Sequence, residues 1–356
     1  MKVLGHPAVC ALTTVIILAG CGGAQNANAG AVPRTTVGVR ARHATSWMAS
    51  AASSGDLLYV SDAGSNAVDV YSYPERVKVG QLSGLGMPGG LCVDGAGDIF
   101  VTNIAASGTS SIVEFAHGGT APIQTLNDPG MEPSGCAVNP VTGDLAVVNY
   151  CPYSQSGGCE NGRGNILIYP GAKGSPRSHK APGVTHFSYC AYDSGGTLYA
   201  DGYGRRSHSF ELAELPKGGD KLGKIQIHWT YSEPEIIDPG GVQWDGKFLA
   251  IGYPQGENIT PSVYRVDPSN GHIASVRKLH KSQSILQYFI DGNVLIAPNR
   301  ERSGTGQIFF YSYPKGDKLS KVIDDLDVPV AVVVSPGAHN SCSQGLTPNR
   351  LVSCER

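Results

Sequence analysis

Charge is scarce in this sequence, and neither sign dominates. Of the 356 residues only 16% are charged, and 27 Lys and Arg stand against 29 Asp and Glu. A protein that binds nucleic acid needs a concentrated basic surface, so the composition excludes nucleic acid as a partner. The hydrophobic fraction of 41% supplies enough apolar side chains for a core, which excludes a chain that stays disordered.

The sequence also lacks the common motifs of catalysis. It contains no Gly-x-Ser-x-Gly, no His-Glu-x-x-His and no glycine-rich phosphate loop. Its cysteines form no Cys-x-x-Cys pair, which excludes thioredoxin-like, zinc-finger and haem-attachment sites. Lone histidines such as His186 and His228 are more typical of loops than of catalytic bases. The catalytic residues of any enzyme activity are therefore unknown from the sequence.

No apolar run is long enough to span a bilayer, which takes roughly 20 residues. The longest, Ala8–Ala19, follows Met1-Lys2 and leads into Leu18-Ala19-Gly20-Cys21. This arrangement is typical of an export signal, and the last four residues resemble the bacterial lipobox, in which the Cys is lipidated. We expect a signal peptide over residues 1–20, and a lipidated Cys21 with a flexible tether over 21–44. The alternative is an ordinary secretory signal cleaved near Ala27 or Ala29.

The residue after the lipidated Cys is Gly22 rather than Asp, which favours the outer membrane by resemblance to the sorting rule of diderm bacteria. We therefore expect an exported lipoprotein on the periplasmic side of the outer membrane or at the cell surface. The lipid anchor would be its only contact with the membrane.

A repeat of about 47 residues organises the rest of the chain, and the sequence as a whole is rich in Gly (47) and Pro (23). Each unit has an apolar strand, a glycine turn, a second strand, a polar loop and a third strand. The first strands end at Asp94, Asn139, Asp193, Asp245, Asp291 and Ser335. The second strands are expected at Leu57–Asp62, Asp98–Asn103, Asp144–Asn149, Leu198–Gly202, Phe248–Gly252 and Val294–Pro298. Spacings of 40–50 residues with three or four strands per unit are typical of propeller blades.

The fold that this repeat predicts is an all-β, six-bladed β-propeller over residues 45–336. Helical periodicity is missing outside the N-terminal segment. The strand Val330–Val334 has no unit after it, so we expect it to pair with residues 55–82 and close the ring. Ala49–Ser53 is interpreted as a degraded copy of the first strand. Residues 337–356 form a C-terminal tail.

Seven cysteines follow the tether, and an oxidising compartment favours disulfides. Cys151 and Cys159 bracket one loop, and Cys342 and Cys354 bracket part of the tail, so each is expected to be a local pair. Cys136 and Cys190 occupy the same position of the repeat and are expected to bridge neighbouring blades. Cys92 would then remain as a buried thiol.

Two segments resemble known propeller repeats. Residues 58–71 read Leu-Tyr-Val-Ser-Asp-Ala-Gly-Ser-Asn-Ala-Val-Asp-Val-Tyr, and residues 99–103 read Ile-Phe-Val-Thr-Asn. They resemble NHL and YVTN repeats, and residues 45–336 are similar to six-bladed propellers of the gluconolactonase/paraoxonase type. The resemblance implies the fold and specifies no chemistry.

A calcium ion in the central channel is implied by this resemblance. In lactonase-type propellers oxygens from different blades hold the ion, and Ca²⁺ takes six to eight such ligands. The matching oxygen donors here are Asp62, Asn103, Asn149 and Asp201. The alternative is turn formation, because tight turns also prefer Asp and Asn.

The loops between second and third strands are long and differ from one another, and binding often resides in such loops. They are expected to share one face, the loop face, with the segments that precede the first strands. Tyr and Arg, which are enriched at binding hot spots, occur there as Tyr150, Tyr153, Arg163, Tyr203, Arg205, Arg206, Tyr253, Arg300 and Arg302. The alternative is a solvated rim.

Three functions are consistent with these patterns. The first is a lipid-anchored propeller that binds a protein, a glycan or a small ligand through its loop face, without catalysis. The second is a calcium-dependent hydrolase of lactones or esters of the gluconolactonase type. The third is a structural protein of the envelope or surface.

Overall fold

The repeated unit folds into a four-stranded antiparallel sheet in which chain order and spatial order coincide. The second blade contains β5 (Met87–Val93), β6 (Ile99–Ile104), β7 (Ser110–Phe115) and β8 (Pro122–Asn127). Asp94 Oδ1 accepts hydrogen bonds from the backbone N–H groups of Ala96 and Asp98, each at 2.9 Å. Gly97 has a φ of 91°, which a side chain with a Cβ rarely adopts. The Asp and Gly of the repeat therefore build its first turn.

Four further blades follow the same order. The third contains β9 (Met131–Val138), β10 (Leu145–Pro152), β11 (Ile166–Tyr169), the short helix η2 (Pro170–Ala172) and β12 (Arg177–His179). The fourth contains β13 (Val184–Tyr192), β14 (Leu198–Gly204), β15 (Phe210–Leu215) and β16 (Gly223–Ile225). The fifth contains β17 (Val242–Trp244), β18 (Leu249–Tyr253), β19 (Ser262–Val266) and β20 (Ile273–Lys278). The sixth contains β21 (Phe289–Asp291), β22 (Val294–Asn299), β23 (Gly306–Ser312) and β24 (Ile323–Leu326).

The first blade combines strands from both ends of the described chain. Its order is β1 (Trp47–Met48), β4 (Lys78–Leu82), β3 (Ala67–Tyr73), β2 (Asp56–Asp62) and β25 (Pro329–Ser335). The predicted pairing of Val330–Val334 with the first unit is therefore present, because Leu57 lies opposite Ser335 and Val60 opposite Val332.

The interpretation of Ala49–Ser53 as a degraded first strand is wrong. Residues Ser50–Ser53 form a short 3-10 helix, η1, and the preceding β1 pairs with β4 at the far edge of the sheet. The position next to β2 is occupied by β25, which leaves no place there for a strand from the N-terminal side.

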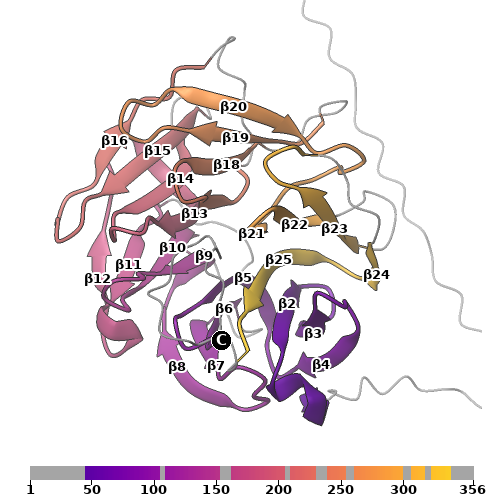
Figure 1. The fold of residues 1–356 in the computed structure, drawn as a ribbon. Helices are drawn as coiled ribbons and strands as arrows, with labels where there is room; N and C mark the ends of the chain where they lie inside the picture. The colour runs from indigo at the N-terminus through magenta and orange to yellow at the C-terminus, as the bar shows by residue number, and fades with distance from the viewer. Residues whose placement is uncertain are drawn as a thin grey trace, which may run out of the picture. The chain divides into compact units, whose positions relative to one another are not determined.

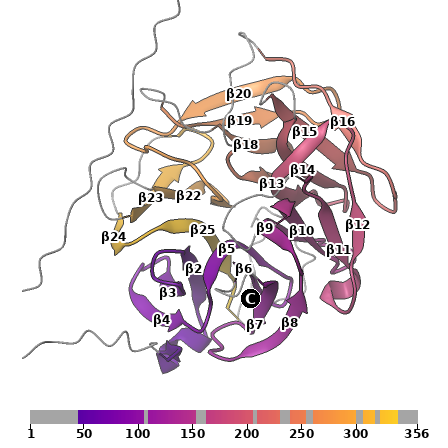
Figure 2. The same ribbon diagram turned by 180° about the vertical axis from the view of Figure 1, so that it is seen from behind.

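The six sheets surround a common axis, as Figures 1 and 2 show, and form a six-bladed β-propeller. The computed structural model describes residues 45–104, 109–152, 162–204, 209–229, 239–253, 260–299, 306–316 and 322–337, all within the unit His43–Arg356. Among these residues no helix has the length and apolar character needed to cross a membrane. The expected signal peptide, Cys21 and most of the tail lie outside the described residues.

The core lies between neighbouring blades, because alternate residues of a strand point to opposite faces of its sheet. On β6, Ile99 and Val101 pack in a cluster with Tyr59 of the first blade. Phe100, between them, packs with Tyr169 of the third blade. This period of two fixes which neighbour each side chain reaches.

The same alternation corrects the predicted disulfide between Cys136 and Cys190. Cys136 is bonded to Cys92 with a Cα–Cα distance of 5.7 Å, and Cys190 is a buried free thiol. Cys136 and Cys190 share a repeat position, so both point toward the preceding blade and cannot meet. Cys92 lies one position later in its repeat and points toward the following blade, where Cys136 faces it. Ala137, in turn, packs with Cys190.

The two local pairs fall partly or wholly outside the described residues. Cys151 is disulfide-bonded, and Cys159, the expected partner, lies outside the described residues together with Cys342 and Cys354. Both pairings therefore stay predictions.

Candidate functional site

A cavity of about 260 Å³ occupies one end of the central channel. Its walls are formed by the last residues of the six innermost strands, β5, β9, β13, β17, β21 and β25, and by the turns that follow them. The innermost strands run in the same direction along the channel, so their ends meet at one face. This face is opposite the loop face, because each innermost strand begins at the loop face. We call this cavity the channel pocket.

One repeat position supplies a residue from every blade to the wall of the channel pocket. It is the residue just before the repeated Asp, Asn or Ser, and it comprises Val93, Val138, Tyr192, Trp244, Ile290 and Val334. The first four are partly exposed, because the cavity leaves one side of each uncovered. A repeat that serves the fold thus also builds a ring of mostly apolar side chains around the axis.

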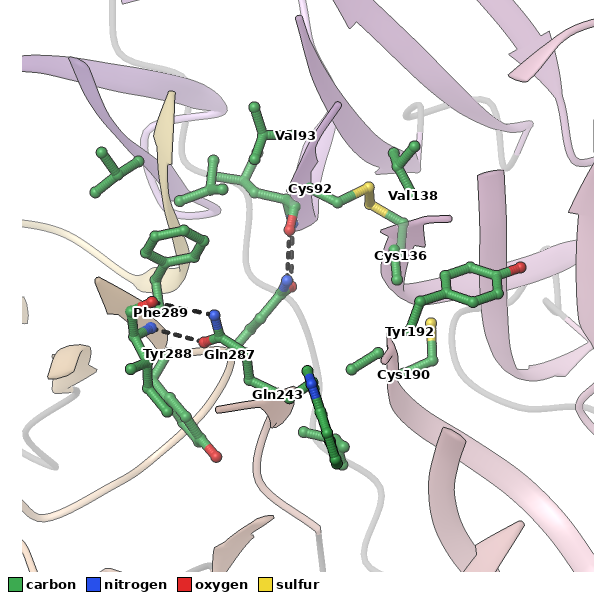
Figure 3. Close-up of a pocket in the computed structure, with 18 of the residues that line it drawn as sticks. Cys92, Val93, Cys136, Val138, Cys190, Tyr192, Gln243, Gln287, Tyr288 and Phe289 are labelled. Atoms are coloured by element: carbon green, nitrogen blue, oxygen red, sulfur yellow. Dashed lines mark hydrogen bonds between the residues drawn. A yellow bond between two sulfur atoms is a disulfide. The ribbon is translucent and has the colours of Figure 1, made fainter. Parts of the chain in front are cut away.

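The wall differs between the two halves of the ring. Blades four, five and six contribute the aromatic side chains of Tyr192, Trp244 and Phe289, whereas blades one to three contribute Val334, Val93 and Val138. In Figure 3, Phe289 and Tyr192 lie on opposite sides of the two central glutamines. The lining therefore contains both aromatic and aliphatic residues, and the aromatic ones come from blades four to six.

Two glutamine side chains bridge the innermost strands beside the pocket (Figure 3). Gln287 pairs with the backbone of Leu91: its Oε1 accepts from Leu91 N–H at 3.0 Å and its Nε2 donates to Leu91 O. Gln243 pairs with Ile290 in the same way, accepting from its N–H at 2.6 Å and donating to its O at 3.3 Å. Because each amide uses both its donor and its acceptor, these bridges hold the strands in place.

The charged residues that line the channel pocket are Asp94 and Asp291, and no Lys, Arg or His is among the described lining residues. Carboxylate oxygens of Asp94, Asp98 and Glu114 lie within 4.8 Å of one another. Burial, together with the charge of Asp98, raises the pKa of Asp94, while hydrogen bonds from backbone amides oppose the shift. Burial and the two aspartates raise the pKa of Glu114, which Lys173 partly offsets. Three acidic groups therefore gather on the side of the second blade, with Lys173 close to Glu114.

The four residues predicted to hold calcium lie on four different blades. Two of them, Asp62 and Asn103, accept hydrogen bonds from the backbone of loops. Asp62 accepts hydrogen bonds from the N–H groups of Asp327 (2.9 Å) and Val328 (2.7 Å), one on each carboxylate oxygen. Asn103 Oδ1 accepts from the N–H of Gly86 at 2.8 Å. Both side chains thus hold the backbone of other loops. Asp62 also has the turn role that the sequence left open, because its Oδ1 accepts from the Gly64 N–H at 3.1 Å.

The other two predicted ligands each keep one buried oxygen without a hydrogen-bond partner, Asn149 Oδ1 and Asp201 Oδ2. Asn149 donates to Asn165 at 2.9 Å, and Asp201 Oδ1 accepts from Tyr189 N–H at 2.8 Å. Burial raises the pKa of Asp201 well above its usual value, which favours a neutral carboxylic acid there. Calcium accepts amide and carbonyl oxygens as well as carboxylates, so an ion shared by these four residues stays a prediction.

Because the oxygens of Asp62 and Asn103 already accept from backbone N–H groups, we expect melts of the full chain in millimolar calcium and in EDTA to superimpose. A site filled at a hundredfold excess over its Kd would add about 2.7 kcal/mol, which corresponds to several degrees in Tm for a chain of this size. A reproducible rise in Tm with calcium, absent with magnesium, would contradict this expectation and support the calcium interpretation.

On the loop face, the described tyrosines pack against other rings. Tyr150, His186 and Tyr203 form a cluster in which the His186 and Tyr203 rings stack at 4.6 Å and the two tyrosine hydroxyls contact each other. Tyr203 and Tyr253 are 8% and 9% exposed, so they offer little free surface. Arg163 is exposed. Tyr153, Arg205, Arg206, Arg300 and Arg302 lie outside the described residues, and binding at the loop face stays a prediction.

No protein-family model and no curated protein matches the chain. Solved structures do match it. TolB from Acinetobacter baumannii is 14% identical to this chain and superimposes with a TM-score of 0.58. The match covers 80% of this chain and 67% of the TolB chain. A protein of unknown function from Bacteroides caccae is 13% identical over 79% of this chain and 99% of its own, with a TM-score of 0.56. The likeness is one of fold.

A third match is a "putative 6-phosphogluconolactonase" from Bacteroides fragilis, 15% identical over 80% of this chain and 99% of its own, with a TM-score of 0.50. In all, 877 solved chains match, so the propeller is too widespread to select one activity. The function has to be argued from the site.

Sequence reasoning missed the channel pocket because it treated the ends of the innermost strands only as markers of the repeat. A signal was present in the position before the repeated Asp or Asn, where Tyr192 and Trp244 replace the Val of Val93 and Val138. Such variation at one position of an otherwise regular repeat indicates a surface that serves binding as well as packing.

Proposed function

We propose that this protein is a binding protein that takes a small ligand into the channel pocket. The observation that carries the proposal is a cavity of about 260 Å³ whose wall combines side chains from all six blades. Ligand sites are concave and mostly apolar, and they lie where a rigid scaffold brings several elements together. The ends of six paired strands form such a scaffold.

The bridges made by Gln243 and Gln287 support this proposal, because they preform the site. Each ties together two innermost strands from different blades through a pair of hydrogen bonds. A ligand that enters a preformed cavity does not have to order the strands, so less of its binding energy is lost.

Fluorescence of 1-aminoanthracene, an apolar probe that brightens out of water, tests whether the cavity is used. We expect the full chain to bind the probe, and Val138→Phe to abolish binding because the larger ring fills the cavity. Val77→Phe is the matched control, since Val77 is 58% exposed and lies outside the pocket lining. Equal probe binding by both variants would refute the proposal.

We further propose that the protein is exported and anchored by a lipid on Cys21. The proposal rests on the apolar segment Ala8–Ala19 and on Leu18-Ala19-Gly20-Cys21, which resembles a lipobox. An exported protein meets an oxidising compartment, and the Cys92–Cys136 disulfide is consistent with one. We also propose that the pairing of β25 with β2 closes the ring of blades.

A further inference from the structure

We propose that the ligand of the channel pocket is a small organic cation with an apolar, ring-containing body. This inference rests on the proposed function, because it names the class of ligand that the same cavity takes. It is carried by the combination of an aromatic wall with carboxylates as the charged groups of the described lining.

The aromatic wall favours both a ring and a positive charge. Tyr192, Trp244 and Phe289 line the pocket from three successive blades. The faces of aromatic rings carry partial negative charge, so they attract cations at a distance of about 6 Å or less. They also offer flat surfaces against which the ring of a ligand packs.

The size of the cavity limits the ligand. A volume of about 260 Å³ lies near the lower end of the roughly 300–1,000 Å³ that small-molecule sites occupy. One bicyclic ring system with a short side chain meets this limit. A polymer or a folded partner does not.

The charged residues at the rim of the pocket indicate which sign of charge the ligand carries. Asp94 and Asp291 follow directly on the wall positions Val93 and Ile290. Asp98 and Glu114 add negative charge beside Asp94. A cationic group of the ligand at the rim would be attracted by the aspartates, whereas a phosphate or carboxylate group of a ligand would be repelled by them. Val93, Val138 and Val334 add apolar surface to the lining for the body of the ligand.

Three probes with the same indole body but different charge test the inference. Tryptamine carries a positive charge, tryptophol is neutral, and indole-3-acetate is negative. By calorimetry with the full chain we expect tryptamine to bind at least about tenfold more tightly than tryptophol, and indole-3-acetate to bind more weakly than either. Added salt should weaken tryptamine binding and leave tryptophol binding unchanged.

The double variant Asp94→Asn/Asp291→Asn tests the carboxylates without breaking the turn. Asparagine keeps the Oδ1 acceptor that Asp94 presents to Ala96 and Asp98. We expect this variant to bind tryptamine and tryptophol with affinities within about threefold of each other. Asp220→Asn, at an exposed aspartate outside the lining, should leave the preference intact. If the double variant does not fold, the salt dependence of the unmodified chain serves as the same test.

The outcomes separate this inference from the proposed function. Equal binding of tryptamine and tryptophol, with both lost in Val138→Phe, would overturn the ligand class and leave a binding pocket. Preferred binding of indole-3-acetate would also overturn the class. Failure of all three probes together with 1-aminoanthracene would overturn both.

Discussion

A chain that ends at Val328 will fail to fold. Without β25 the first blade loses the strand that pairs with β2 from Leu57 to Asp62. Val332 and Val334 are buried in a cluster with Phe310 of the sixth blade, and Ala331 and Val333 in a cluster with Leu91 of the second. Burial of the three valines alone contributes roughly 5–9 kcal/mol, which is comparable with the whole stability of a typical domain. The measurement is the near-UV circular dichroism and the thermal transition, both of which should disappear.

A point variant separates the loss of the strand from the loss of the tail. Val333→Asp places a charge where the side chain is 2% exposed, and we expect it to unfold the full-length chain. Val77→Asp, at a 58% exposed position, should change the free energy of unfolding by no more than about 0.5 kcal/mol. A cooperative melt of Val333→Asp near that of the unmodified chain would show that β25 is dispensable.

Replacing Asp245 by alanine is expected to cost about 3–5 kcal/mol of stability, because it leaves a partly buried cation without its partner. Asp245 Oδ2 accepts hydrogen bonds from Arg265 Nε and Tyr313 OH, both at 2.6 Å. Its Oδ1 accepts from the backbone N–H groups of Lys247 (3.1 Å) and Phe248 (2.8 Å). The carboxylate thus joins the first turn of the fifth blade to the sixth blade. Chemical denaturation of Asp245→Ala measures the loss.

The pH dependence of this loss identifies the charge as its cause. Burial of the Asp245 carboxyl opposes ionisation, but the hydrogen bonds from Arg265 and Tyr313 outweigh it and lower the pKa below the usual 3.8. The contribution is therefore fully present at neutral pH and is lost as the pH falls below about 4. The difference between the unmodified chain and Asp245→Ala should shrink in acid. A difference that stays constant between pH 7 and pH 3 would contradict the argument.

Asp220→Ala is the control for this prediction. Asp220 is exposed, and its removal should change the free energy of unfolding by no more than about 0.5 kcal/mol. A comparable loss in both variants would mean that the effect of Asp245→Ala does not come from its buried network.

The strands were predictable because their signals are local. The second strands expected at Leu57–Asp62 and Leu198–Gly202 are observed as β2 (Asp56–Asp62) and β14 (Leu198–Gly204). A short continuous apolar run such as Leu57–Val60 marks a strand that is buried on both faces, and Asp with Gly marks a turn. These patterns depend on neighbours a few residues apart, so a single sequence displays them.

Asp62 shows the limit of such patterns. It is the last residue of β2, and its oxygens accept from backbone amides of Asp327 and Val328. Those partners are 265 and 266 residues away in the sequence. No local pattern distinguishes a carboxylate that holds a distant loop from one that holds an ion.

The sequence by itself determined the number of blades, the course of their strands and the turns between them, because these follow from short apolar runs, from turn residues and from how often the unit recurs. Only the tertiary structure decided that Cys92 rather than Cys190 bonds Cys136, and that the ends of the innermost strands enclose a pocket. The first depends on which face of a blade meets its neighbour, and the second on six equivalent residues converging on one axis. Both depend on how different repeats lie relative to one another in space, and the residue pattern within one repeat carries no information about that.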